Sequence, residues 1–337
     1  MPMIGIVRGF GEGAAATDCV VKLIKALNRR FRSSIHFEMI DCGDYIAHGS
    51  LLTNNVLHRI KQCDCIFVSD FESRHNPIEF TKSDIAYALS ANIEYLHIEG
   101  FDNCAKTDVC IASYFDGGFR MREGNATTEG CEETRVCSAF AMSNIVKEVS
   151  RKCEARRRRL AFVKDSENEY CADYFRHFFQ QFTLPLSNFQ FVEFTAREFS
   201  KTFLSSPDAF DMVFASKTFA DTIGGVAEFL MKDKYASYRC YNSEIPVYTV
   251  SSLQSNSACG EYIPSICCYI AALSGLLGNE FNMEKEAVQL KKATDIALNE
   301  VVNFHSANSF INVIINALNI PVTTKYSKKP TKSRYIK

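Results

Sequence analysis

The chain has 337 residues, of which 47% are hydrophobic and 23% are charged, and its formal net charge is -1. This is ordinary globular composition, in a chain long enough to bury a sizeable core. A net charge near zero gives no reason to expect a nucleic-acid or membrane partner, and no apolar run approaches the roughly 20 residues of a membrane span. The first predicted strand begins at Met3, so we expect no targeting segment in this chain.

The fourteen cysteines are scattered through apolar stretches, as at Cys19, Cys153 and Cys267. A chain of this length can build a core without disulfides, so we expect reduced, buried cysteines rather than a disulfide framework. Cys63 and Cys65 form the one tight pair. Because no second pair or histidine lies nearby, we do not expect a zinc site there.

Short apolar runs alternate with amphipathic segments in the first half of the chain, which predicts an α/β fold. We expect strands at 3–7, 34–40, 64–69, 94–98 and 108–114, and helices at 14–30, 51–61 and 82–90. His97 lies in an apolar strand, where a hydrogen-bonded core histidine is favoured over a ligand.

A glycine-rich turn follows the first strand and contains Gly9, Gly11 and Gly13. Two interpretations compete for it. A G-x-G-x-G turn between a strand and a helix is a weak signal for a phosphate-binding loop. The same glycines also allow a tight turn that packs closely on its surroundings, and we favour this second interpretation.

The second half continues the alternation. We expect strands at 160–163, 189–194, 210–214 and 244–250, and helices at 143–159, 170–182, 219–230, 264–277, 283–303 and 309–318. Ser143 is the expected N-cap of its helix, which ends in four arginines at 156–159. We interpret these as a solvated helix end that complements the helix dipole, rather than a nucleic-acid site. The basic tail 323–337 is expected to be disordered rather than a nucleic-acid arm.

One stretch, 207–230, organises the chain. A short apolar strand ends at Phe214, a polar corner follows at 216–218, and Asp221 stands early in the next helix. Many α/β enzymes present a ligand at such a carboxyl end of a strand. The segment therefore directs the search for a site to Asp221.

The same stretch resembles the motif F-D-hydrophobic run-T-N-L-[YF]-G-D-I-x-S-D of the β-decarboxylating dehydrogenases, the isocitrate and isopropylmalate dehydrogenases. Phe210, Asp211, Phe219 and Asp221 fit this motif. The three glycines of the first turn match G-D-G-I-G-P-E, and Arg122 with the glutamate after it matches a later family segment. The agreement in order extends over about residues 3 to 305.

The resemblance implies the α/β architecture of isocitrate and isopropylmalate dehydrogenases. A large domain would contain 1–98 and 245–320, and a small domain, 99–244, would carry a dimer interface. The helices expected at 143–159 and 219–230 are candidates for that interface. The tail 321–337 would lie outside both domains.

The same comparison implies that most substrate-binding and cofactor-binding positions are lost. Arginines that clamp the substrate carboxylates in the family align with Ser90 and Gly100. The family's catalytic tyrosine has no counterpart, since no tyrosine lies between Tyr114 and Tyr170. Of the loop that wraps the adenosine of NAD, Ser252 and Gly260 remain among the few matches. The segment 125–133 is short and polar where the family has a longer protruding clasp.

Catalytic and metal positions are also altered. The family's active-site lysine aligns with Asp165, and Lys164 is one residue early, on the opposite face of the strand. Of three aspartates that bind Mg²⁺ in the family, only Asp221 remains. The others align with Gly225 and Arg197, and we expect Arg197 to take the metal's place beside Asp221.

Three functions follow from this resemblance. The first is a catalytically silent structural or regulatory subunit like those of NAD-dependent isocitrate dehydrogenase. Such a subunit would bind neither NAD nor Mg²⁺. It would pair with a related subunit as a homo- or heterodimer and bind citrate or a nucleotide. The second is a divergent active dehydrogenase using NAD and Mg²⁺. The third is a scaffold in an unrelated assembly. The resemblance implies the mitochondrial matrix, with the cytoplasm as the alternative.

Overall fold

The computed structural model describes residues 1–9, 12–40, 52–70, 82–100, 108–114, 122–127, 130–135, 138–165, 170–186, 188–231, 235–250, 262–300 and 307–319. The strands are β1 Met3–Val7, β2 His36–Ile40, β3 Cys65–Val68, β4 Ile93–Gly100, β5 Asp108–Tyr114, β6 Arg122–Thr127, β7 Gly130–Arg135, β8 Arg159–Lys164, β9 Gln190–Thr195, β10 Met212–Ala215, β11 Tyr235–Asn242 and β12 Val247–Thr249. The helices are α1 Glu12–Phe31, α3 Asn54–Ile60, α4 Lys82–Ala88, α5 Ala139–Ala155, α6 Tyr170–Thr183, α7 Ala196–Ser205, α8 Lys217–Met231, α9 Tyr262–Asn279, α10 Glu284–Glu300 and α11 Ala307–Ala317.

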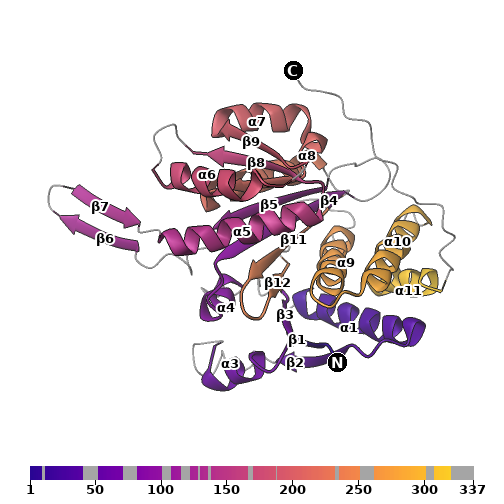
Figure 1. The fold of residues 1–337 in the computed structure, drawn as a ribbon. Coiled ribbons are helices and arrows are strands. Elements are labelled where there is room, and N and C mark those ends of the chain that lie inside the picture. The colour runs from indigo at the N-terminus through magenta and orange to yellow at the C-terminus, as the bar shows by residue number, and fades with distance from the viewer. Residues whose placement is uncertain are drawn as a thin grey trace.

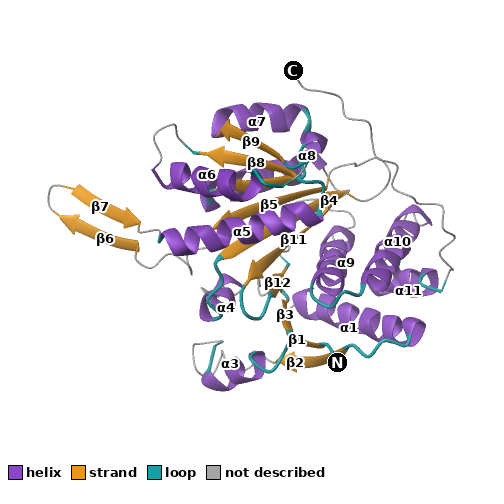
Figure 2. Ribbon diagram, in the orientation of Figure 1, coloured by secondary structure: helices purple, strands orange, loops and turns teal. Residues whose placement is uncertain are grey.

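A ten-stranded sheet runs through the molecule in the order β2-β1-β3-β12-β11-β4-β5-β10-β8-β9 (Figures 1 and 2). The four strands at the β2 end are parallel to one another, and so are the four at the β9 end. β11 and β4 lie between these groups and pair antiparallel with each other and with their outer neighbours. The sheet contains strands from both expected domains, and the division into domains stays a prediction.

Apolar side chains cover both faces of the sheet. On one face the core contains residues of α1, α5, α6, α9, α10 and α11, such as Leu23, Phe179 and Leu273. On the other face, two smaller clusters gather under α3 and α4 and under α7 and α8. Helix α8 therefore lies against the central strands, where Leu96 of β4 and Ile223 of α8 share one cluster.

The glycine turn packs as the second interpretation predicts. A β-carbon built on Gly9 would lie 1.8 Å from the backbone oxygen of Asp70, and one built on Gly13 would lie 2.1 Å from the same atom. Ser69 also donates a hydrogen bond to the Gly13 carbonyl at 2.7 Å. Gly9 and Gly13 thus let the start of α1 approach the end of β3, and the close-packing interpretation is confirmed.

Residues 125–127 and 130–133 of the polar segment belong to the hairpin β6–β7, which projects from the body in Figure 1. One expectation about the middle of the chain is wrong. The helix expected at 143–159 is α5, which begins at Ala139 because the Ser138 side chain accepts a hydrogen bond from the Ala141 amide. Ser143 is therefore inside the helix, and the four arginines follow its end.

The cysteines whose side chains the structure describes are free thiols, and all of them except the half-buried Cys171 are buried. This confirms the expectation of reduced, buried cysteines for these residues. A search of the same residues for a membrane-crossing segment finds no helix that is both long and apolar enough.

Candidate functional site

Helix α8 begins at Lys217, two residues before the expected start. The hydroxyl oxygen of Ser216 accepts a hydrogen bond from the Phe219 amide at 3.3 Å, and the Ser216 carbonyl accepts one from Ala220. The supposed polar corner is therefore the N-terminus of the helix. Because residues four apart share a helix face, Lys217 is placed directly beside Asp221.

Four charged residues meet where α8 packs on the central strands. Glu94 comes from β4, Arg239 from β11, and Lys217 and Asp221 from α8; we call these four residues the charge cluster. The Lys217 ammonium lies 2.7 and 2.8 Å from the two carboxylate oxygens of Asp221, and 3.1 Å from each oxygen of Glu94. The Arg239 guanidinium binds Glu94 and lies 3.0 Å from Asp221.

Because Glu94 is buried, its carboxylate needs these cationic partners to remain charged in the folded chain. Its side chain is only 1% exposed, and an unpaired carboxylate there would lose its hydration without compensation. Burial disfavours the charge of Arg239, but Glu94, Tyr241 and Asp221 together outweigh this effect and raise the pKa of the guanidinium. Burial, together with Glu94, also raises the pKa of the neighbouring Tyr241. The cluster thus contains two cations that balance two carboxylates.

This arrangement does not fit the Mg²⁺ of the dehydrogenases. A hard divalent cation needs an oxygen shell, and both oxygens of Asp221 are already bound by Lys217. Gly225, where the motif has its final aspartate, supplies no ligand, although a β-carbon there would meet no atom within 4 Å. Among the described residues, no group of three or more histidine, cysteine or acidic side chains could hold a metal ion.

Three other predicted site residues, Lys164, Asp165 and Arg197, lie elsewhere in the fold. Lys164 ends β8 and forms an ion pair with Glu193 on the neighbouring strand β9. Asp165 follows it and is exposed. Arg197 is exposed in the first turn of α7. Its expected contact with Asp221 across a dimer stays a prediction, and within one chain Asp221 is paired with Lys217 and Arg239.

For the remaining candidate residues, Arg122, Ser252 and Gly260, the structure describes no side-chain contacts. Arg122 begins β6, where its backbone pairs with Arg135, and its side chain lies outside the described residues. Ser252 and Gly260 fall in 251–261, which is also outside the described residues. The expected remnant of a nucleotide site at Ser252 and Gly260 therefore stays a prediction.

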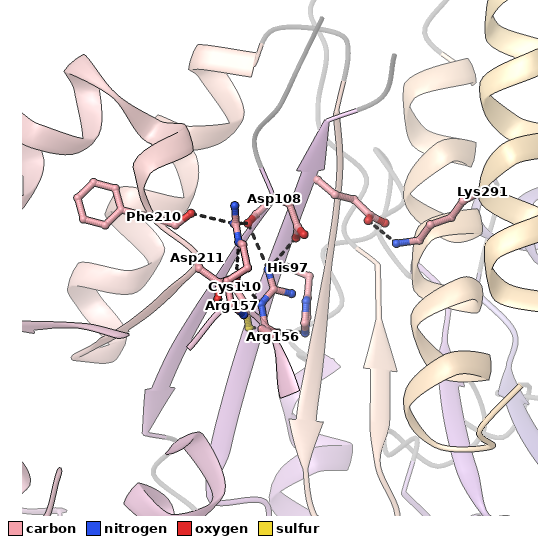
Figure 3. A network of polar contacts seen from close by, with 9 residues as sticks. His97, Asp108, Cys110, Arg156, Arg157, Phe210, Asp211 and Lys291 are labelled. Atoms are coloured by element: carbon pink, nitrogen blue, oxygen red, sulfur yellow. Dashed lines mark hydrogen bonds and ion pairs between the residues drawn. The ribbon is translucent and has the colours of Figure 1, made fainter. Parts of the chain in front are cut away.

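A second ionic network corrects the interpretation of the arginine run. Arg156 binds Asp211 and Asp108, both at 2.8 Å, and its side chain is only 20% exposed (Figure 3). Arg157 donates its backbone amide to the second oxygen of Asp211, also at 2.8 Å. Because Asp211 is 1% exposed, these arginines neutralise a buried carboxylate. Arg156 fastens the end of α5 to β5 and to the residue before β10, so the interpretation as a solvated helix end is wrong for this arginine, whereas Arg157 and Arg158 are 44% and 40% exposed.

His97 is a core residue, as expected. It is buried and stacks on Tyr238 with ring centroids 4.7 Å apart. Its Nε2 lies 3.8 Å from the Cys110 sulfur (Figure 3). Burial and the nearby charges of Lys152, Arg156 and Lys291 hold the pKa of His97 well below its usual value. The neutral imidazole of His97 therefore belongs to the packed interior.

Three members of the charge cluster, Glu94, Lys217 and Arg239, were not predicted from the sequence. The spacing of Lys217 and Asp221 was available as a signal once the N-cap at Ser216 was recognised. A glutamate at the start of the expected apolar strand 94–98 was a second signal, because a buried carboxylate requires a cation. Nothing in the sequence identified Arg239, which lies opposite Leu96 only through the pairing of β11 with β4.

No protein-family model matches the sequence, and no curated protein matches it. Solved structures do match. The fold is similar to an apo β-decarboxylating dehydrogenase of Thermococcus kodakarensis, with a TM-score of 0.80 and 13% identity over 94% of this chain and 96% of that one. It is also similar to the isocitrate dehydrogenase of Methylococcus capsulatus, with a TM-score of 0.76 and 14% identity over 94% and 99%. The chain therefore has an isocitrate dehydrogenase-like mixed α/β fold.

Proposed function

We propose that this chain is a catalytically silent protein with the fold of the β-decarboxylating dehydrogenases, acting as a structural or regulatory subunit like those of NAD-dependent isocitrate dehydrogenase. One observation carries the proposal. Asp221, the retained aspartate of the motif, has both carboxylate oxygens bound by Lys217 and lies 3.0 Å from Arg239. The two positive charges of Lys217 and Arg239 take the place of a divalent cation.

Losses elsewhere support the same conclusion. Oxidation and decarboxylation of a 2-hydroxy acid require groups that grip the substrate carboxylates and a metal that stabilises the enolate. By the resemblance, the gripping positions are Ser90 and Gly100, and one metal position is Gly225. Lys164, the nearest candidate for the catalytic lysine, is paired with Glu193 in its own chain. These positions offer neither a carboxylate clamp nor a metal shell.

The proposed partner, ligand, domain division and compartment rest on the sequence resemblance alone. We propose that the chain pairs with a related subunit, through helices that include α8, and that it binds citrate or a nucleotide as a regulator. The large domain would contain 1–98 and 245–320, and the small domain 99–244. The mitochondrial matrix is the proposed compartment.

Turnover tests the proposal. The full chain would be incubated with NAD⁺, Mg²⁺ or Mn²⁺, and isocitrate or isopropylmalate, while absorbance at the NADH wavelength is followed. We expect no NADH above the enzyme-free blank. An Asp221→Asn variant purified in parallel identifies any contaminating dehydrogenase, since contaminant activity is the same in both preparations. Substrate-dependent NADH formation that the variant abolishes would overturn the proposal.

A further inference from the structure

One face of helix α1 carries charge of a single sign. No acidic residue lies between Asp18 and Glu38, and every exposed residue from position 19 to position 33 is a lysine or an arginine. The apolar residues of the same helix, such as Leu23 and Leu27, are buried. The exposed cations are Lys22, Lys25, Arg29, Arg30 and Arg32. The net charge of -1 therefore conceals a separation of charge that is formed only when the chain folds.

Helix α11 presents a row of amides to solvent. Its apolar residues Phe310, Ile311 and Ile314 are buried. Every exposed residue from position 307 to position 319 is an asparagine, and these are Asn308, Asn312, Asn316 and Asn319. Because residues three and four apart share one side of a helix, the asparagines form a single line along α11.

The cations and the amides lie side by side on neighbouring helices (Figure 1). The Lys22 ammonium donates to the side-chain oxygen of Asn308 at 2.6 Å, and Arg30 donates through Nε to the Leu318 carbonyl at 3.2 Å. Helices α1 and α11 therefore run in the same direction. The asparagine row is roughly 16 Å long, because each helical residue adds about 1.5 Å. We call the five cations and the four asparagines together the cation–amide face.

Ordinary solvation of a helix does not account for this face. Surface helices usually mix charges of both signs, because like charges three or four residues apart destabilise a helix. Lys22, Lys25 and Arg29 have this unfavourable spacing. The helix dipole favours only the cations of the last turn, Arg29 and Arg30. Neither effect explains the lysines farther back along α1 or the uniform row of asparagines.

The positive charge is not neutralised within the described part of the chain. The acids nearest in sequence, Asp18 and Glu38, are paired with Arg8 and Arg59, and no described carboxylate forms an ion pair with a cation of this face. Arg32 also has a φ of 55°, in the left-handed region where glycine is the least costly residue. A polyanion bound to the face would offset these costs.

The polar character of the face distinguishes between possible polyanions. A membrane or an acidic protein would bury apolar side chains at its contact surface, but none of the exposed large hydrophobic side chains among the described residues belongs to α1 or α11. Lysine, arginine and asparagine are side chains that bind the phosphates and sugars of nucleic acids. Single strands also stack their bases on exposed aromatic rings, which these helices lack, so a duplex fits better.

The asparagines favour RNA over DNA. An asparagine amide both donates and accepts hydrogen bonds, and so does the 2′-hydroxyl group that only RNA carries. We propose that the cation–amide face binds double-stranded RNA. The lysines and arginines of α1 contact phosphates, and the asparagines of α11 contact 2′-hydroxyl groups of the shallow minor groove. Binding is independent of base sequence, and this function goes beyond the proposed dehydrogenase-like role without depending on it.

Fluorescence anisotropy of the full chain with a labelled RNA duplex tests the inference. The duplex would have about 20 base pairs, because double-stranded RNA-binding domains span roughly 16. The competitors are a DNA duplex of the same sequence, the single RNA strand, and vesicles of phosphatidylcholine with phosphatidylserine. We expect the RNA duplex to bind at least about fivefold more tightly than the DNA duplex, the effect of one or more hydrogen bonds.

Three variants with exposed positions separate the two rows. Lys25→Gln should weaken RNA binding and reduce the slope of log affinity against log salt by about one, because one phosphate contact is lost. Asn312→Ala should weaken RNA binding by about fivefold and leave the salt slope and DNA binding unchanged, because it removes no charge. Lys201→Gln, on α7, is the matched control and should change neither quantity.

Several outcomes would overturn the inference. They are an absence of binding to the RNA duplex, equal affinity for the DNA duplex, and equal losses in Lys25→Gln and Lys201→Gln, which would indicate non-specific attraction. Binding to vesicles without binding to RNA would identify a membrane contact and would also overturn it. The proposed function fails separately, through substrate-dependent NADH formation, whatever the cation–amide face binds.

Discussion

The ammonium group of Lys217 holds both carboxylate oxygens of Asp221, at 2.7 and 2.8 Å, from one helical turn away. The same ammonium lies 3.1 Å from the buried carboxylate of Glu94. Lys217 thus connects α8 to the central strand β4. A position that resembles a metal ligand in the dehydrogenases is here part of a contact within one chain.

Replacing Lys217 should destabilise the fold. Lys217→Met leaves Glu94 with Arg239 alone, and we expect the free energy of unfolding to fall by about 1–3 kcal/mol, less than for a fully buried pair because Lys217 is 37% exposed. Urea denaturation measures the change. Lys285→Met, on the exposed side of α10, is the matched control and should change it by less than about 0.5 kcal/mol. Equal effects would contradict the role of Lys217.

Two substitutions should rebuild a metal site. Lys217→Asn with Gly225→Asp removes the ammonium from both oxygens of Asp221, which keeps its contact with Arg239 alone. It also restores two motif residues, and the space at Gly225 accepts a side chain. We expect the double variant to bind Mn²⁺, measured by electron paramagnetic resonance of the free ion, at least tenfold more tightly than either single variant. If Gly225→Asp alone binds as well as the double variant, Lys217 does not block the site.

Two arginines near the C-terminal end of α5, Arg156 and Arg151, should differ sharply in their contribution to stability. Arg156→Met removes a partner of the buried Asp211 and should cost about 3 kcal/mol of stability, since Arg157 compensates only in part. Arg151→Gln breaks an exposed pair with Glu148, in which the arginine is 76% exposed, and should cost less than about 1 kcal/mol. Thermal unfolding of the two variants checks the difference. Similar midpoints would mean that the Arg156 network contributes little.

His97 should make the fold sensitive to mild acid. Burial holds its pKa in the folded chain below the unfolded value of about 6.5, so only the unfolded chain takes up a proton as the pH falls below that value. Stability should therefore decrease below about pH 6.5, by at most about 1.4 kcal/mol per pH unit from this group.

Replacing His97, with an exposed histidine replaced as the control, isolates this effect. His97→Gln should flatten the slope of unfolding free energy against pH between about 6.5 and 5. His177→Gln, at an exposed position on α6 beside Gln181, should retain the slope. Asp108, whose pKa Arg156 lowers despite burial, contributes to acid sensitivity only below about pH 4, outside this window. A slope unchanged in His97→Gln would mean that other groups cause the acid sensitivity.

The fold was predictable where burial leaves a strong pattern. Strands β1 and β5 have the expected bounds because both are largely apolar runs with a neighbouring strand on each side. The hairpin β6–β7 was missed because its sequence, REGNAT and GCEETR, has few apolar residues. β11 was missed as well, although it is one of the two strands that join the halves of the sheet.

The site was less predictable, because its partners are distant in sequence. Asp221 was identified, but Glu94 and Arg239 reach it only through the antiparallel pairing of β4 with β11. The arginine run was misinterpreted for the same reason, since the carboxylates of Asp108 and Asp211 are far from Arg156 along the chain. A count of local charges cannot distinguish a solvated cation from one that neutralises a buried acid.

The order of strands in the sheet has a consequence for synthesis on the ribosome. β5, β8, β9 and β10 form one edge of the sheet from residues 108–215 and can pair while later residues are still being added. β3 and β4 cannot be joined until β11 and β12 have emerged, because these two strands lie between them. The first strands made therefore keep an unpaired edge until residue 249 is available, and unpaired strand edges of this kind favour aggregation during synthesis.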